Sequence, residues 1–162
     1  MSDPTRALRD QLVRVLDWGE AHVTFDQAVD GLAPDTLGTR AAGFEHTPWQ
    51  LVEHIRIAQA DILDFCVNPA YTHAMTWPDD YWPADAAPPS SRAWTESLAV
   101  YRRDREAVKR LAHDVPELTA RVPTGNETQT YLRAILLVAD HAAYHVGQIV
   151  AVRKALGLWP AA

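Results

Sequence analysis

The sequence has 162 residues and a mass of 18.0 kDa, the size of one ordinary domain, so we expect a single domain over residues 1–162. Hydrophobic residues make up 48% of the chain and charged residues 22%, a globular composition that excludes wholesale disorder. The net charge of −6 has the wrong sign for binding to nucleic acid through phosphates, so we expect no nucleic-acid partner.

The sequence also bears on location. No apolar run approaches the roughly 20 residues that span a bilayer, and the charged N-terminal string MSDPTRALRDQL lacks the apolar core of an export signal. A single cysteine, Cys66, cannot form an internal disulfide. We therefore expect a cytoplasmic protein with no membrane partner.

Two helical segments are predicted in the first half of the chain. The first runs from about Pro4 to Val29, where apolar residues recur near the 3.6 period, and Gly31 follows as a stop signal. The second begins at Thr47, which has a glutamine three residues later in the spacing of a capping box. It ends before the Asn-Pro pair at 68–69.

Two further helices are predicted in the second half. The third runs from about Ser91 to His113, and the fourth from about Thr130 to Leu156, with Gly157 after it. Apolar residues cover most of the circumference of the fourth helix, so we expect it to be the most buried. Four long amphipathic helices predict an all-α protein with a four-helix bundle.

The connection between the second and third helices is unusually long. Residues 69–90 contain five prolines and show no helical period, so they form no helix. They also contain Tyr71, Trp77, Tyr81 and Trp82, and aromatic side chains at this density need a surface to pack on. We expect an ordered connection that lies over one end of the bundle.

Three histidines form a candidate metal site. His141 and His145 lie four residues apart on the fourth helix, so both face one side and point into the bundle with its apolar residues. His54 lies at the edge of the apolar stripe of the second helix and supplies a third imidazole. Three neutral imidazoles leave coordination positions open, as in a catalytic site. The alternative is a set of structural histidines; the remaining ones, His22, His46, His73 and His113, receive no role.

Other polar residues near these histidines are candidates for the chemistry. Gln148 follows His145 by three residues and is expected to hydrogen-bond an imidazole or a bound water. Asp61 shares a helix face with His54 and would orient an imidazole or act as a base, although a solvated carboxylate is the simpler interpretation. Tyr144 is either a substrate contact or a buried structural residue. Gly147 inside a helix predicts the close approach of another helix, from this chain or a second subunit.

Aromatic residues are candidates for a substrate pocket. Trp49 and the connection residues Trp77, Tyr81 and Trp82 would form a wall suited to an apolar or aromatic small molecule. The alternative is that these residues only seal the end of the bundle.

Two strings give the sequence a family likeness. TPWQLVEHI contains His54, HAAYHVGQI contains His141 and His145, and RKALGLWP follows near the C-terminus. With these strings the chain resembles the DinB family, also called DinB/YfiT-like metalloenzymes. The resemblance implies a four-helix bundle of up-down-down-up order, with residues 69–90 as the long connection between helices 2 and 3. It also implies that the three histidines bind a divalent metal ion, usually zinc or nickel, and that the protein forms a homodimer.

The functional hypotheses follow from this site. An open tris-histidine centre lowers the pKa of a bound water or thiol, and the resemblance implies a low-molecular-weight thiol as a cofactor. The leading hypothesis is a metal-dependent enzyme of the thiol-dependent S-transferase or hydrolase type that acts on a small molecule. The alternatives are a non-catalytic metal- or ligand-binding bundle related to stress, and a metal-free bundle that works through dimerisation.

Overall fold

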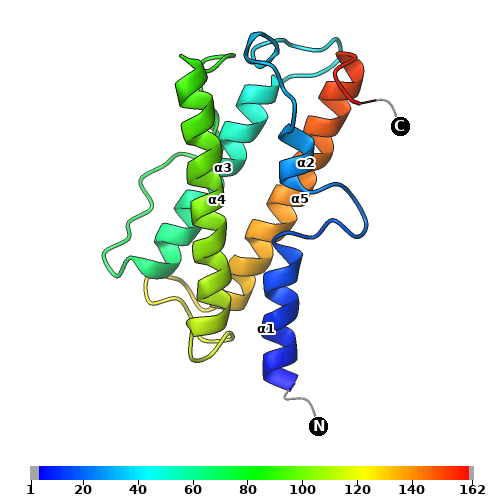
Figure 1. Cartoon of the computed structure of the whole chain (residues 1–162). Helices are drawn as coiled ribbons and strands as arrows, with labels where there is room; N and C mark the ends of the chain where they lie inside the picture. Colours follow the sequence, from blue (N-terminus) through cyan, green and yellow to red (C-terminus); the bar gives the residue numbers. More distant parts are fainter. Residues whose placement is uncertain (1–3, 161–162) are drawn as a thin grey trace.

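The computed structural model describes residues 4–160, which form five α-helices and two short 3-10 turns (Figure 1). The helices are α1 (Pro4–Val15), α2 (Phe25–Val29), α3 (Pro48–Val67), α4 (Ser91–Asp114) and α5 (Tyr131–Ala155), and the turns are η1 (Pro34–Thr36) and η2 (Asp79–Tyr81). Within the described range there is no β-strand, only an isolated bridge between residues 121 and 130. The expected all-α class is confirmed.

The first predicted helix is wrong in its extent, because it is divided in two. α1 ends at Val15, and α2 begins at Phe25 after a non-helical segment. A Cβ atom at Gly19 would lie 2.8 Å from Thr24 Cγ2, so the intervening chain turns back too tightly for a helix. Thr24 then starts α2 with a capping box in which it exchanges hydrogen bonds with Gln27.

The other helix ends follow the expected local signals. Thr47 caps α3 through the predicted capping box, Ser90 caps α4 and Thr130 caps α5. Gly157 follows the last turn of α5 with a φ of +69°, a left-handed conformation that glycine adopts without a steric cost.

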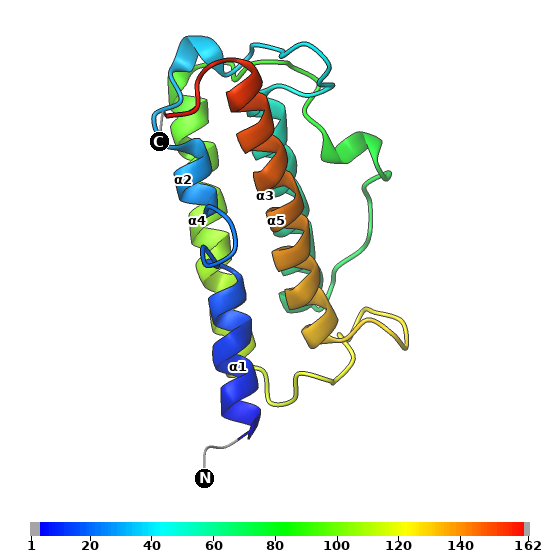
Figure 2. The same cartoon turned by 90° about the vertical axis from the view of Figure 1, so that its right-hand side faces the viewer.

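The helices pack along one long axis. α1, α2 and α5 run in one direction and α3 and α4 in the other, with α1 and α2 one after the other along the same side (Figures 1 and 2). One core cluster joins α2 to the N-terminal half of α3 and the C-terminal half of α5. A second joins α1 to the C-terminal half of α4 and the N-terminal half of α5. The pairing of α3 with α5 positions the candidate site.

The long connection after α3 is fixed to the start of that helix. The Thr47 hydroxyl donates a hydrogen bond to the Ala86 carbonyl at 2.6 Å, and Gln50 Nε2 donates to the Pro83 carbonyl at 3.4 Å. These contacts hold the segment that contains Tyr81 and Trp82 against α3.

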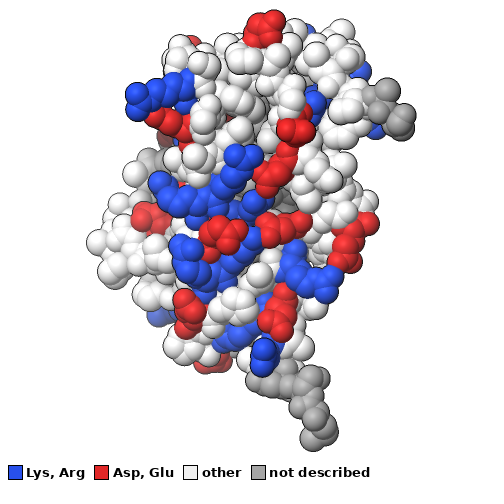
Figure 3. Space-filling model, in the orientation of Figure 1, with Lys and Arg blue, Asp and Glu red and all other residues white. Residues whose placement is uncertain are grey.

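Charged side chains on α4 form ion pairs with α2 and with the segment before it (Figure 3). Arg102 and Arg105 both bind Asp26, at 2.7 and 2.9 Å, and Arg105 also binds Asp17 at 3.1 Å. Lys109 pairs with Asp17 as well. We call these five residues the α4 ion-pair network.

By length and composition alone, α5 could cross a membrane. Arg133 and Asp140 interrupt this helix, so it contains no apolar run of spanning length, although its mean hydropathy is high enough for a span. The finding is weak evidence for a span, since the core helix of a soluble protein passes the same test. The absence of a membrane partner stays a prediction.

Candidate metal centre

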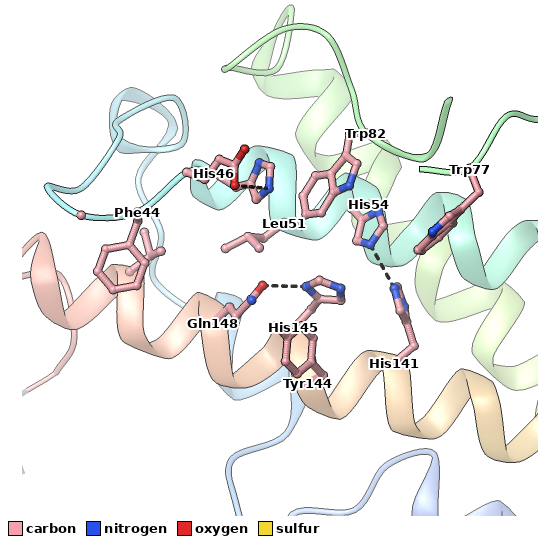
Figure 4. A pocket seen from close by; sticks show the side chains of 13 residues that line it. Phe44, His46, Leu51, His54, Trp77, Trp82, His141, Tyr144, His145 and Gln148 are labelled. Atoms are coloured by element: carbon pink, nitrogen blue, oxygen red, sulfur yellow. Dashed lines mark hydrogen bonds and ion pairs between the residues drawn. The ribbon is translucent and has the colours of Figure 1, made fainter. Parts of the chain in front are cut away.

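His54, His141 and His145 converge between α3 and α5 (Figure 4). One ring nitrogen from each lies within 4.8 Å of the others, and the Nε2 atoms of His54 and His141 are 3.0 Å apart. His141 and His145 are one helical turn apart on α5, and α3 brings His54 to the same point. The predicted convergence of residues separated by nearly 90 positions is present in the structure.

The backbone and a side-chain amide set the orientation of two of these rings. His54 Nδ1 lies 2.8 Å from the Tyr81 carbonyl oxygen, and His145 Nδ1 lies 2.7 Å from Gln148 Oε1. Both oxygens can only accept, so Nδ1 carries the proton and donates in each ring. The Nε2 atom then keeps its lone pair and faces the cluster. Gln148 therefore occupies the tautomer-fixing position that its helix spacing predicts.

The surroundings keep the imidazoles neutral. Burial lowers the pKa of His54 to about 4, opposed in part by the Tyr81 carbonyl and reinforced by His145. Burial and the two neighbouring histidines lower the pKa of His141 to about 4 as well. Burial also lowers the pKa of His145, against the effect of Gln148. At neutral pH all three rings can offer a lone pair to a cation.

This donor set fits a divalent ion. Lone pairs that face each other away from water are costly unless a proton or a cation lies between them. A shared ion uses three neutral imidazoles at once, and imidazole ligands suit zinc, nickel, copper and iron. The three histidines could therefore hold a metal ion, and their chemistry alone does not select which one.

An aromatic stack packs against one face of the His54 ring. The Trp82 ring lies parallel to the His54 ring, with centroids 3.8 Å apart and planes 3° apart. On its other side Trp82 stacks against His46, with a centroid distance of 3.7 Å. His46 had no predicted role, yet it belongs to the wall of the site (Figure 4). No spacing in the sequence could reveal it, because the contact depends on the path of the connection that carries Trp82.

The cluster opens into a pocket of about 540 Å³. Aromatic side chains from separate segments line it, namely Phe44, Trp77, Trp82 and Tyr144. Among the described lining residues Glu45 is the one formally charged side chain, and it is largely solvent-exposed. The pocket wall therefore favours an apolar or aromatic molecule and offers no cation to an anionic one.

Asp61 affects the histidines indirectly, through Tyr81. Its carboxylate accepts hydrogen bonds from the Tyr81 hydroxyl at 2.6 Å and from the Tyr71 hydroxyl at 2.9 Å, and the structure shows no direct contact with an imidazole. Burial and this carboxylate raise the pKa of Tyr81, so its hydroxyl remains a donor. Because the Tyr81 carbonyl binds His54, Asp61 anchors the segment that orients that ring.

The structure places only two of the four expected wall residues in the pocket. Trp77 and Trp82 line the pocket. The Tyr81 side chain is buried and faces a neighbouring cavity of about 210 Å³ that also touches His141. Trp49 does not reach the pocket: it lies buried in the core beside Trp94, because it points away from His54 on α3.

Tyr144 and Gly147 on α5 do not have the structural roles that their sequence positions suggested. Tyr144 is 64% exposed, so it is no buried structural residue, and its ring meets His145 edge-on at 4.8 Å. A Cβ atom at Gly147 would meet nothing within 4 Å, so no other part of the described chain approaches it closely.

One of three comparisons with known proteins identifies a family. Residues 18–149 match the family model described as the DinB superfamily, and this range contains all three histidines. Searches of the curated proteins and of the solved structures return no match. Since the matched range covers well over half of the sequence, the chain belongs to the DinB superfamily.

Proposed function

We propose that this protein is a metal-dependent enzyme that transfers a thiol to an apolar or aromatic electrophile. The observation that carries the proposal is the set of three neutral imidazoles that meet at the base of an aromatic pocket. His54, His141 and His145 would hold one divalent ion, zinc or nickel. The proposal includes a low-molecular-weight thiol as the second reactant.

A divalent ion bound there supplies Lewis acidity, which lowers the pKa of a coordinated thiol or water. The protein's own residues do the rest. The Tyr81 carbonyl and Gln148 keep the Nδ1 protons of His54 and His145 in place. The aromatic walls bind the electrophile and exclude water from the face where the sulfur attacks.

The transfer step balances without a redox partner. The thiol loses its proton to solvent, its sulfur forms a bond to an electrophilic carbon, and the leaving group departs with the electron pair of the broken bond. With a chloroarene the products are a thioether, chloride and a proton. Hydrolysis is the same displacement with water as the nucleophile, and a pocket wall whose one formally charged side chain is the exposed Glu45 favours neither nucleophile.

The proposed fold of this enzyme is an up-down-down-up four-helix bundle in one domain. α1 and α2 together would form its first helix, with α3, α4 and α5 as the other three. The directions of the helices support this description (Figure 1), and the connection over residues 68–90 covers the side of the bundle that holds the histidines.

A thiol panel tests the proposal. Protein loaded with zinc or nickel is incubated with 1-chloro-2,4-dinitrobenzene and each of several thiols, and thioether formation is followed by absorbance. We expect rates that depend on the metal and fall to background in His141→Ala. Binding of one ion per chain with metal-independent rates for every thiol and for ester substrates would overturn the enzyme and favour a non-catalytic metal-binding bundle. A chain that binds no ion would overturn both.

A further inference from the structure

A series of three cavities runs along the groove between α3 and α5. The first is the metal pocket, and the second, of about 210 Å³, shares Trp77 and His141 with it. The third, of about 430 Å³, shares Asp61, Ile62 and Leu137 with the second. In Figure 2 the first part of the connection after α3 rises beside these two helices as far as η2, and its side chains form the outer wall of the groove.

α5 is less buried than expected, in part because it lines these cavities. It buries nine of its 25 residues whereas α3 buries ten of 20, so the expectation that α5 is the most buried helix is wrong. Leu137 lines both the second and the third cavity and is 38% exposed, and its neighbour Leu136 is 47% exposed. The groove therefore contains apolar surface that the chain itself leaves uncovered.

The second cavity suits an apolar chain. Ala58, Ile62, Trp77 and Leu137 form most of its wall. Its one carboxylate, Asp61, already accepts hydrogen bonds from the hydroxyl groups of two tyrosines in the connection. A charged group would be costly in this cavity, whereas an apolar segment would gain from leaving water.

The third cavity offers hydrogen-bond donors to an anion. The Arg133 side chain has no ion pair within 4.0 Å in the part of the chain that the structure describes. Gln129 accepts a hydrogen bond from the Asn126 backbone through Oε1, so its amide nitrogen remains a donor. Thr124 adds a hydroxyl group to the same wall. A guanidinium with an amide and a hydroxyl group suits a carboxylate, and the charge of Asp61 favours a position near Arg133.

Arg133 lies at a fixed distance from the histidines. It precedes His141 by eight residues on α5, which is about 12 Å along the helix axis. The metal pocket itself contains no cationic side chain among its described lining residues. The groove therefore has an apolar reacting end and a cationic end, separated by an apolar middle.

We propose that the electrophile of this enzyme is an elongated amphiphilic acid. Its reacting carbon lies in the metal pocket, its apolar chain occupies the second cavity, and its carboxylate binds Arg133. The inference rests on the proposed function, because it places the reacting carbon beside the histidines. In the transfer step the thiol sulfur bonds to the terminal carbon of the chain, the leaving group departs with the electron pair of the broken bond, and the thiol proton goes to solvent.

Binding of decanoate tests the site apart from any reaction. We expect calorimetry with the zinc-loaded protein to give a Kd at least about fivefold higher in Arg133→Gln than in the native chain, since the variant loses a charge-assisted hydrogen bond. Arg110→Gln, at an exposed position on α4, is the matched control and should bind decanoate as the native chain does. Equal Kd values in the native chain and Arg133→Gln would overturn the proposal, because the carboxylate would then lie elsewhere, for example on the metal. A native chain that binds no decanoate would overturn it as well.

A series of ω-bromoalkanoates of increasing length tests the distance. We expect kcat/KM for thioether formation to pass through a maximum at the length that spans the metal pocket and Arg133, and the maximum to disappear in Arg133→Gln and with the methyl esters. Equal profiles for acids and esters would overturn the proposal. Turnover of 1-chloro-2,4-dinitrobenzene without decanoate binding would refute this substrate class and leave the proposed function standing. Decanoate binding without turnover of any electrophile would refute the proposed function, and with it the role of the acid as a substrate.

Discussion

The α4 ion-pair network and the histidine cluster differ in whether their partly buried polar groups have partners of opposite charge. In the network each carboxylate lies against at least two cations, as Asp26 does with Arg102 and Arg105. In the cluster three imidazoles meet with no counter-charge beside them, and burial keeps them neutral. The network satisfies itself. In the cluster, the Nε2 atoms of His54 and His141 lie 3.0 Å apart, close enough for one metal ion to bind to both rings in place of the proton that they share.

The difference separates stability from function. Charged groups that form ion pairs within the chain stabilise the fold. Buried imidazoles that have no counter-charge within the chain become favourable when they bind a ligand. Substitutions in the network should therefore lower the free energy of unfolding and spare metal binding. Substitutions in the cluster should lower metal affinity and spare the free energy of unfolding.

The largest effect is expected from the cluster itself. His141→Ala removes one of three ligands, and we expect zinc affinity to fall at least about 100-fold, beyond the range that supporting residues produce. Competition with a chromophoric chelator measures the dissociation constant. His113→Ala, an exposed histidine on α4, is the matched control and should bind zinc normally. Equal affinity in the two variants would show that the cluster is not the metal site.

A substitution in the α4 ion-pair network should lower stability and leave zinc affinity unchanged. Arg105→Met leaves Asp17 and Asp26 without their shared buried partner, and we expect the free energy of unfolding to fall by about 2 kcal/mol, as for other hydrogen bonds to charged groups. Urea denaturation measures it. Arg92→Met breaks an exposed pair with Glu96 and should cost less than about 0.5 kcal/mol. A loss of zinc affinity in Arg105→Met would contradict the separation of the two regions.

The anchor beneath His54 should show an intermediate effect. Tyr81→Phe keeps the backbone carbonyl that binds His54 but loses the hydroxyl that binds Asp61, and we expect zinc affinity to fall about tenfold. The visible spectrum of bound cobalt should change with it, because the ring is less firmly oriented. Tyr71→Phe leaves the Tyr81–Asp61 bond in place and should stay within about twofold of the native affinity. Identical affinities and spectra for the two variants would exclude the anchoring role.

The smallest effect is a pH dependence in the network. Burial raises the pKa of Asp26, but hydrogen bonds from Arg102 and Arg105 outweigh it and hold the pKa below 3.8, with Asp17 and Tyr101 as the other facing groups. A carboxyl with a depressed pKa stabilises the fold above its unfolded value and loses that contribution as the pH falls through its folded pKa. Asp26→Asn should therefore cost up to about 1 kcal/mol at pH 7 and progressively less below about pH 4. Urea denaturation at pH 7 and pH 3 checks this; equal costs at both would contradict it.

Local signals in the sequence were sufficient to predict the histidine cluster. The four-residue spacing of His141 and His145 and the capping box at Thr47 both act within one or two helical turns, so the structure retains them. The break after Val15 was missed because apolar residues continue at helical spacing across it. The threonine at 24 with a glutamine at 27 repeats the capping signature of α3 and could have revealed the second start.

Features that depend on the long connection could not be predicted. The role of His46 and the inward turn of the Tyr81 side chain both require knowledge of where residues 68–90 cross the helices. That path is set by hydrogen bonds between residues more than 30 positions apart, such as Thr47 with Ala86. The exposure of Leu136 and Leu137 could not be predicted either, because a leucine at helical spacing gives the same sequence pattern whether it is buried or exposed.

The stacking of Trp82 between His46 and His54 has a practical consequence. Its indole lies within van der Waals contact of two imidazoles, one of which is a candidate metal ligand. A cation that withdraws electron density from His54 changes the environment of this chromophore, so its fluorescence should report occupancy of the centre without any added label. The chain has six tryptophans, and the difference in emission between the native protein and Trp82→Phe isolates the contribution of this one. Trp82 is therefore expected to serve as an intrinsic fluorescent probe of metal binding to these histidines.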